Sequence, residues 1–386
     1  MRNRLTAGLL TALVLWPAVP ARALTDADQK VIDRGLDSLY RCDYGGAEKI
    51  FLDALEERPH DPPLSLGYAI ATWWRMENEF GPAGSPEEER FLVAVKDAIA
   101  DAERVVAKKT DPEAYVCLGA AYGLRGRLEA ARKRWLHAYM DGRRSYKAEE
   151  RALELDPKLD DAYLGLGAFD YYASRLSHFV RHFMFAKGDK DKGLAELARA
   201  THGHFSADAA RLLIVGIDWT FEKKPDEAKA ILDELHARYA DSPLIDFMRL
   251  IDRLRARDTE ALRRDAKTYL EKAENGAPHF RPIDRAAGHY FLGVGEELAG
   301  HYEVAIAEEK AALELIPEGN RARGVPKLFI GECLDLMGKR DEAVKEYKEA
   351  LQEPQFWGAQ RYAKFLLKKP FRVGDNPLPA QSEELE

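Results

Sequence analysis

Apolar and small residues recur along this chain at helical spacing, and the clearest example runs from Asp111 to Gly142 as DPEAYVCLGAAYGLRGRLEAARKRWLHAYMDG. Two helices approach each other closely only where their side chains are small, so Gly119 and Ala131 predict the crossing point of an antiparallel helix pair. Gly126 is expected to make the turn between these helices. The larger residues expected to fill the space around the crossing are Tyr115, Leu118, Tyr122 and Trp135.

The same arrangement recurs in other stretches of the chain. The glycines expected at the crossing points are Gly35, Gly119, Gly167, Gly216, Gly293 and Gly331. Their successive separations are 84, 48, 49, 77 and 38 positions. The two longest separations each leave room for one further, degenerate helix pair, which we expect at 62–109 and 243–273. The pattern therefore predicts an all-α chain of about seven to eight helical hairpins.

These positions match the tetratricopeptide repeat pattern, in which W-x2-L-G-x2-Y is followed by A-x3-F. Tyr115 takes the Trp position, and Ala131 with Trp135 fills the second half. The chain therefore resembles the tetratricopeptide repeat family. The resemblance implies a right-handed α-α superhelix over 24–369, a solenoid in which each hairpin contacts only its neighbours in sequence. Because the family period is about 34 residues, the repeats of this chain are irregular.

The centre of the chain departs most from the plain repeat. Gly167 and Gly193 are 26 positions apart, whereas Gly119 and Ala131 are 12 apart, so 26 − 12 = 14 residues are inserted. The insert, at about 175–187, is aromatic and basic. At helical spacing its apolar residues share one face, so we expect a short amphipathic helix that covers a groove as a fixed plug or a movable lid. The residues of this insert or lid are Leu176, Phe179, Phe183 and Phe185.

The same central region is similar to the eukaryotic tetratricopeptide repeat protein thirty-nine family. The shared features are an aromatic pair at the end of a first helix, S-x-L, an aromatic and basic insert, and G-D followed by G-L-x-x-L. Ser177 and His178 stand where that family has prolines. This resemblance implies the fold rather than a function.

The two ends of the chain are expected to lie outside the solenoid. A basic start, the apolar run LTAGLLTALVLW and small residues at Ala21 and Ala23 predict a signal peptide over 1–23. A membrane anchor needs roughly 20 apolar residues, and Pro17 interrupts the run too early. We therefore expect an exported protein, periplasmic or secreted, from a bacterial source. At the other end, 355–369 predicts a capping helix and 370–386 a disordered tail.

The net charge limits the class of partner, and the positions of the cysteines predict whether they form disulfides. The formal net charge is −8, and removal of the signal peptide with its three arginines gives −8 − 3 = −11. An acidic surface repels phosphates, so nucleic acid is not expected as a partner. Membrane contact is not favoured. Cys42, Cys117 and Cys333 fall on different, non-adjacent hairpins and are expected to be free, buried thiols.

Two groups of residues could in principle carry chemistry. His178 and His182 share a helical face, and His202 and His204 follow in the sequence, but no HExxH motif accompanies them. We expect these histidines at the surface, with a metal-binding protein or hydrolase as an alternative. The helical acids are expected to lie on solvated faces; they are Asp170, Glu296, Glu297, Glu308 and Glu309. No catalytic residue and no cofactor are predicted.

The inner helices lack the Lys and Asn positions with which some tetratricopeptide proteins grip a carboxylate, so no carboxylate-clamp chaperone partner is expected. An apolar and aromatic strip stands there instead, suited to a peptide segment. Its predicted residues are Tyr40, Leu164, Tyr171, Tyr172 and Tyr290. The sequence thus predicts an exported, non-enzymatic scaffold for a protein or peptide, with an envelope-associated structural component as a further alternative.

The leader generates the first testable prediction. Ala21 and Ala23 supply the small side chains that signal peptidase requires, so the exported protein should begin at Leu24. Intact-mass measurement of protein recovered from the cell envelope tests this expectation. A species that retains Met1 there would contradict it.

Overall fold

The computed structural model describes residues 26–79, 84–175 and 188–377, and within them every regular element is helical. The α-helices are α1 (Asp26–Tyr40), α2 (Tyr44–Glu57), α3 (Pro62–Glu79), α4 (Pro86–Val106), α5 (Pro112–Ala131), α6 (Trp135–Leu155), α7 (Tyr163–Ser174), α9 (Lys190–Ala200), α10 (Ala207–Ile217), α11 (Pro225–Arg238), α12 (Pro243–Arg255), α13 (Thr259–Glu274), α14 (Pro282–Leu298), α15 (Tyr302–Leu315), α16 (Gly324–Leu336), α17 (Arg340–Ala350) and α18 (Ala359–Leu366).

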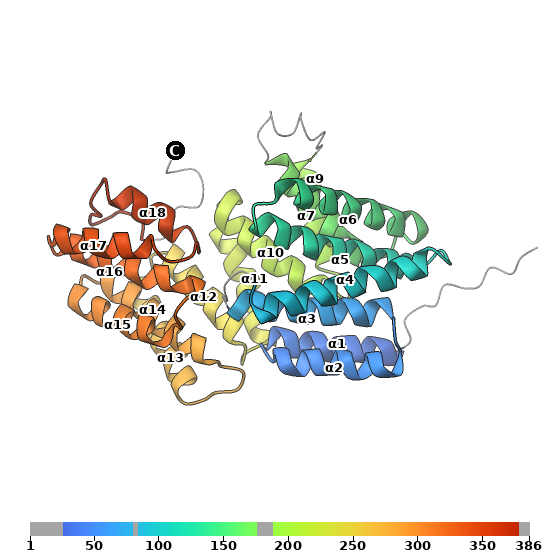
Figure 1. Ribbon diagram of the computed structural model, residues 1–386, viewed down its shortest axis with the longest axis horizontal. Coiled ribbons are helices and arrows are strands. Elements are labelled where there is room, and N and C mark those ends of the chain that lie inside the picture. The colour runs from blue at the N-terminus through green and yellow to red at the C-terminus, as the bar shows by residue number, and fades with distance from the viewer. Residues whose placement is uncertain (1–25, 80–83, 176–187, 378–386) are drawn as a thin grey trace, which may run out of the picture.

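Consecutive helices pair into hairpins, and the hairpins stack in chain order (Figure 1). The pairs are α1–α2, α3–α4, α5–α6, α7–α9, α10–α11, α12–α13, α14–α15 and α16–α17, and α18 packs on the last of them. The expected helical-hairpin solenoid is therefore confirmed. The degenerate pairs expected at 62–109 and 243–273 are α3–α4 and α12–α13. None of the helices in the described residues is both long and apolar enough to span a membrane.

Glycines set the close approach of the helices in several hairpins. A Cβ at Gly35 would overlap the ring of Phe51, and one at Gly331 would overlap the ring of Tyr347. In α7–α9 the glycines face each other, since a Cβ at Gly167 would lie 2.8 Å from the carbonyl oxygen of Gly193. A larger residue at these positions would force the helices apart. The glycine spacing thus predicted the crossing points of these three hairpins.

The α5–α6 hairpin corrects one detail of the sequence interpretation. Its turn lies at 132–134, so Gly126 is inside α5, and Trp135, which begins α6, is 63% exposed. The side chain above Gly119 belongs to Glu149, whose Cγ would lie 2.5 Å from a Cβ at Gly119. Ala131 and Trp135 therefore do not occupy the crossing.

Longer helices explain the irregular repeat spacing. Phe51 follows the glycine of its hairpin by 51 − 35 = 16 positions, but Glu149 follows Gly119 by 149 − 119 = 30. The 14 extra residues are shared between α5 and α6, so each helix gains about two turns, or roughly 10 Å. The central hairpin has the same count, because Leu197 lies over Gly167 and 197 − 167 = 30. Its extra residues include 176–187, outside the described part of the chain.

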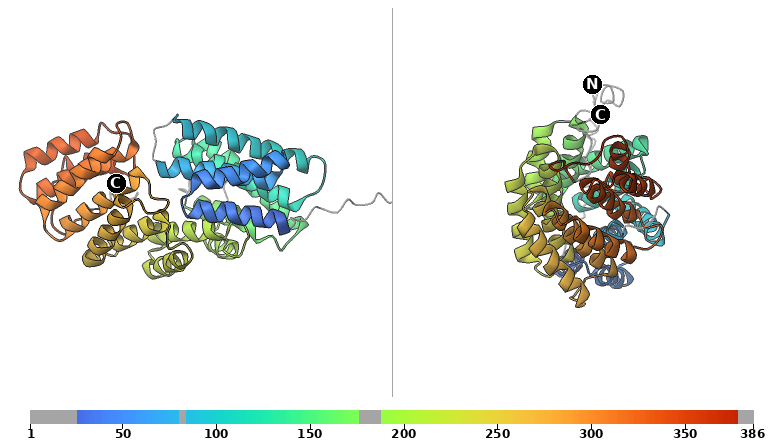
Figure 2. Two further views of the ribbon diagram at one scale, coloured as in Figure 1. Left: turned by 90° about the horizontal axis from the view of Figure 1, so that it is seen from below. Right: turned by 90° about the vertical axis from the view of Figure 1, so that its left-hand side faces the viewer.

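The solenoid also closes on itself, which the sequence interpretation did not anticipate. The rings of Tyr40 in α1 and Tyr239 after α11 lie 5.6 Å apart, and Ser242 Oγ donates a 2.6 Å hydrogen bond to the Tyr40 carbonyl oxygen. Arg41 pairs with Asp241 across the same contact. The first hairpin thus packs against the fifth and sixth, as the left view of Figure 2 also shows. The expectation that hairpins contact only sequence neighbours is wrong at this contact.

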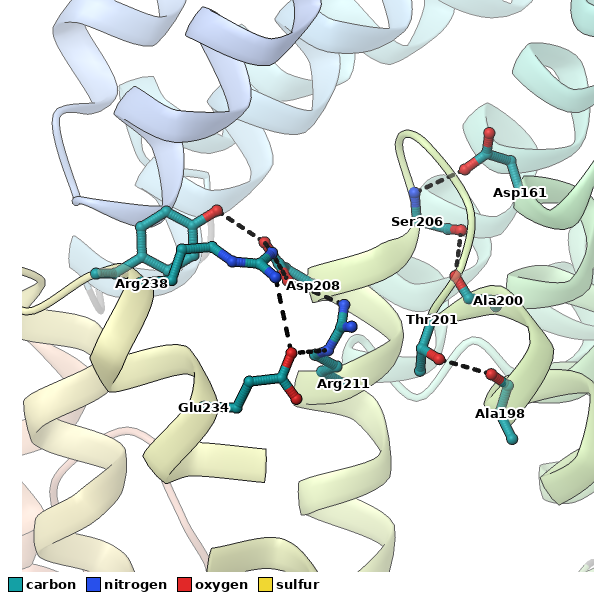
Figure 3. A network of polar contacts seen from close by, with 10 residues as sticks. Asp161, Ala198, Ala200, Thr201, Ser206, Asp208, Arg211, Glu234 and Arg238 are labelled. Atoms are coloured by element: carbon teal, nitrogen blue, oxygen red, sulfur yellow. Dashed lines mark hydrogen bonds and ion pairs between the residues drawn. The ribbon is translucent and has the colours of Figure 1, made fainter. Parts of the chain in front are cut away.

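A polar network anchors this closure (Figure 3). Asp208, at the start of α10, accepts hydrogen bonds from the Tyr239 hydroxyl (2.7 Å) and from Arg238 Nη1 (2.8 Å). Arg211 bridges Asp208 and Glu234, at 3.2 Å from each carboxylate. Because Asp208 is buried, removal of either partner would leave a buried charge partly unpaired. The network therefore holds Tyr239 in place against Tyr40.

The C-terminal end differs in part from the sequence expectation. Helix α18 lies within the expected capping region 355–369 and packs on α16 and α17. Phe371 is only 4% exposed, and Arg257 donates to the carbonyl oxygens of Gly374 and Asp375. Disorder of the tail from 370 onwards is therefore wrong for 371–377, because Phe371 supplies an apolar anchor. Residues 378–386 lie outside the described part.

The three cysteines behave as expected. Cys42, Cys117 and Cys333 are free and buried, on the first, third and eighth hairpins. Burial raises the pKa of the Cys117 thiol well above its usual value, which keeps it in the unreactive protonated form. The thiols therefore serve as core residues.

Candidate functional site

The predicted groove residues do not form one surface. Tyr40, Tyr171 and Tyr290 are buried at 3%, 0% and 7% exposure and belong to three separate core clusters. Leu164 is half-buried, and Tyr172 alone is exposed, at 43%. These side chains pack between hairpins, so an exposed strip made from all five is not available to a partner.

The histidines and the insert give no site within the described residues. His202 is exposed, and His204 lies 3.4 Å from Asp33 of α1. No group of three or more potential metal ligands comes together in the described residues. His178, His182 and the four apolar residues of the insert, Leu176, Phe179, Phe183 and Phe185, lie outside them.

The acidic residues are the clearest error of the sequence interpretation. Of the five acids expected on solvated faces, all but Glu308 are buried, and Glu309 is 0% exposed. Glu309 lies over Gly293, with Oε1 2.7 Å from where a Cβ would stand, in the position that Phe51 and Tyr347 occupy in their hairpins. A glutamate therefore replaces an aromatic ring at this crossing. Glu149 does the same in α5–α6.

Glu309 belongs to a buried carboxyl cluster with Glu297 and Glu332. Burial raises the pKa of Glu297 to about 8, and it raises the pKa values of Glu309 and Glu332 well above their usual value. Cys333 Sγ donates to Glu297 Oε2 at 3.4 Å. Among the described residues, the carboxyl oxygens of Glu309 and Glu332 have no hydrogen-bond partner. These groups are neutral carboxylic acids at moderate pH. Since none of the three is exposed, they cannot reach a substrate.

Ser65, His60 and Asp101 lie close together, but their arrangement does not activate the serine as a nucleophile. Asp101 accepts a 2.6 Å hydrogen bond from Ser65 Oγ and lies 2.9 Å from His60 Nδ1. A serine nucleophile needs the histidine in contact with its own hydroxyl. Here the carboxylate separates Ser65 from His60, so the histidine cannot take the serine proton.

A surface pocket of about 360 Å³ lies where the α2–α3 and α4–α5 connections meet. Its lining carries charges of both signs that pair with one another. Arg58 lies 3.7 Å from Asp61, and Lys109 lies 2.7 Å from Asp111. Because these charges compensate each other locally, the pocket has no evident preference for a charged ligand.

An apolar groove on the C-terminal hairpins is the best candidate for binding. It lies across the first helices α12, α14 and α16, and the loop before α18 closes one side. The enclosed volume is only about 40 Å³, so the groove is shallow and open. This groove, called the C-terminal groove below, is lined by Phe247, Ile283, Ala286, Ala287, Tyr290, Ile316, Ala322, Val325, Pro326, Phe356 and Trp357.

The loop before α18 places Trp357 beside this groove. Phe356 and Trp357 stack with ring centroids 4.9 Å apart, and Trp357 lies 5.7 Å from the ring of Phe247. Gln360 fixes the loop, because its side chain accepts from the Phe356 N–H at 3.0 Å and donates to the Pro354 carbonyl oxygen at 2.7 Å. Trp357 has φ of +46°, which costs a non-glycine residue on the order of 1 kcal/mol. The loop thus holds a 37% exposed tryptophan in a strained position against an apolar surface.

No protein-family model matches this chain, and no curated protein matches its sequence. Among solved structures, yeast Tom70 is 10% identical, with a TM-score of 0.45, over 89% of this chain and 88% of that chain. A Rap protein complexed with competence and sporulation factor is 12% identical (TM-score 0.40; 88% of this chain and 78% of that chain). A human IFIT1 dimer with PPP-AAAA is 15% identical (TM-score 0.38; 85% and 72%). Similarity at this level transfers no partner and no activity.

The carboxyl cluster gives a prediction on stability. Its raised pKa values mean that the folded protein keeps these protons while the unfolded chain loses them near pH 4.5. The stability that the cluster contributes is therefore complete below about pH 4.5 and is lost as the pH rises towards 8, by a few kcal/mol. Glu332→Gln, which keeps the shape without the charge, should flatten this dependence and raise stability at pH 8. Urea unfolding at pH 5 and pH 8 measures both effects.

Glu296→Gln is the matched control, because Glu296 is paired with Arg263 (2.8 Å) and His301 (2.7 Å) and its pKa is lowered. This variant should lose stability at pH 8. Two results together would contradict the expected neutral cluster. The wild type would be equally stable at pH 5 and pH 8, and Glu332→Gln would destabilise it, which would show that the cluster is charged in the folded state.

Proposed function

We propose that this protein is an exported, non-enzymatic helical-repeat scaffold that binds an apolar segment of a protein or peptide in the C-terminal groove. The observation that carries the proposal is the position of Trp357 beside an almost wholly apolar lining contributed by three successive hairpins. Export rests on the leader at 1–23.

The chemistry of the groove suits an apolar segment. Aromatic side chains dominate the energetics of peptide and protein interfaces, and the groove has Phe247, Phe356 and Trp357 on one side. The small residues Ala286 and Ala287 on α14 leave room for an incoming side chain. An amphipathic helix or an extended strand with large apolar residues would bury this lining. The strained backbone at Trp357 is consistent with a residue positioned for binding.

The other classes of function have less support among the described residues. The buried carboxyl groups are inaccessible, the Ser65 and His60 side chains are not in contact, and no set of metal ligands is present there. The net charge of −8 disfavours nucleic acid. The alternative centred on His178 and His182 has no supporting observation, because these residues lie outside the described part.

The test is selection of peptides from a random library on the purified protein, followed by affinity measurement on variants. The selected peptides should be rich in large apolar residues, and Trp357→Ala should weaken their binding roughly tenfold or more. Val93→Ser is the control, since Val93 is 61% exposed on α4 and lies outside the groove. Its replacement should leave the affinity unchanged.

Two results would overturn this proposal. One is a library that yields no binder above background. The other is a set of binders whose affinity is the same for wild type and Trp357→Ala.

A further inference from the structure

The elongated α5–α6 hairpin carries a second unusual surface. Its turn at 132–134 lies about two helical turns further from the crossing glycine than the turn of a short hairpin such as α1–α2. This extension is not needed for the crossing at Gly119.

Large apolar side chains gather at the start of α6. Trp135 is 63% exposed, Leu136 64% and Met140 45%. Of the nine large apolar residues that are exposed in the described part of the chain, these three lie within six positions. Tyr139 lies between them on the helix and packs on Phe169 of α7, with ring centroids 6.4 Å apart. The cluster is therefore one continuous apolar area rather than scattered single residues.

The same segment is strongly basic in an acidic protein. Residues 125–147 contain eight Lys and Arg and two acids, for a net charge of 8 − 2 = +6, whereas the whole chain carries −8. Leu136, Met140, Arg143 and Lys147 follow each other at intervals of three or four, so they share one face of α6. The apolar groups thus precede the basic groups along a single helical face.

Both acids of this segment are already paired. Glu129 lies 2.9 Å from Arg134 Nε, and Asp141 accepts from Arg125 and Arg144 at 2.7 and 3.0 Å. These pairs fix the neighbouring guanidinium groups. Arg132 pairs with Glu88, and the guanidinium of Arg127 lies over the Trp73 ring, 5.1 Å from its centroid. The other three cations are exposed and have no ion pair with any described residue; they are Lys133, Arg143 and Lys147.

We propose that the α5–α6 turn and the exposed side of α6, together called the tip surface, bind an acidic segment of another protein that also carries large apolar residues. The tip surface consists of Lys133, Trp135, Leu136, Met140, Arg143 and Lys147. Carboxylates of the partner pair with the three exposed cations, and its apolar side chains cover Trp135, Leu136 and Met140.

The composition and size of the tip surface favour a protein segment over a lipid surface. Trp, Met and Arg are enriched in protein interfaces, and Trp and Arg are enriched among the residues that carry most of the binding energy. The apolar stripe extends over residues 135–140, roughly 8 Å of helix, which matches a few side chains of a peptide. The positive charge of the tip surface favours an acidic partner over a basic one and raises the association rate.

The tip surface is separate from the C-terminal groove. It lies on the third hairpin, whereas the groove lies on the sixth to eighth hairpins. Its lining differs too, since the groove is apolar and the tip surface carries cations. This proposal therefore does not depend on the groove.

The test uses a labelled synthetic peptide in which Asp and Glu alternate with Leu and Phe, and a second peptide with Lys in place of the acids. The acidic peptide should bind the full-length protein and the basic peptide should not. Trp135→Ser with Leu136→Ser, and separately Arg143→Glu with Lys147→Glu, should each weaken binding roughly tenfold. Added salt should weaken binding to the wild type. Because all four side chains are exposed, thermal melts should confirm that the variants remain folded.

Val93→Ser is the control, and it should bind the acidic peptide like the wild type. Val93 is 61% exposed on α4, so it tests whether any exposed apolar residue suffices. Equal binding by the tip variants, or no binding of the acidic peptide at all, would overturn the proposal. Tip-dependent binding to vesicles of phosphatidylglycerol, without binding of the peptide, would also overturn it and assign the surface to lipid.

Discussion

The contact between the first hairpin and the fifth and sixth hairpins determines which surfaces of this solenoid stay available. In an open solenoid, α1 would stand at the end of the stack of hairpins with one side exposed to solvent. Here Tyr40 packs on Tyr239, and Ser242 bonds the carbonyl oxygen of Tyr40 from 202 positions away. Asp208 in turn holds the Tyr239 hydroxyl. The closure thereby buries Tyr40, the one aromatic residue of α1. The C-terminal groove and the tip surface lie on other hairpins and stay exposed.

Most of the fold could be predicted from small residues at regular positions. Gly35, Gly167 and Gly331 mark real helix crossings because a side chain there has no room. The register of α5–α6 could not be predicted in this way, since the usual separation of 12 was assumed and Trp135 fitted the aromatic position by coincidence. The buried Glu149 and Glu309 were missed because their sequence context does not reveal that they stand in an aromatic position.

The candidate site was harder to predict than the fold. Three of the five predicted groove residues are aromatic residues of the core, and sequence alone does not distinguish an aromatic that packs between hairpins from one that faces a partner. Tyr290 does line the C-terminal groove, but only together with Phe247 and Trp357. These residues come from α12, α14 and a loop, so only the superhelix brings them together. The contact of the first hairpin with the fifth and sixth could not be predicted for the same reason, because local sequence patterns do not encode contacts between residues 200 positions apart.

Native-state hydrogen exchange tests closure most directly. If the first hairpin is part of one cooperative unit, amides of α1 and α2 should open with the same free energy as those of α10 to α12. Ser242→Ala should lower both sets together, by about 2 kcal/mol, because Ser242 Oγ loses its bond to the Tyr40 carbonyl oxygen and its capping bond from the Ile245 N–H. Exchange of α1 and α2 at a lower free energy, unchanged by Ser242→Ala, would show that the first hairpin opens independently and would contradict the closed solenoid.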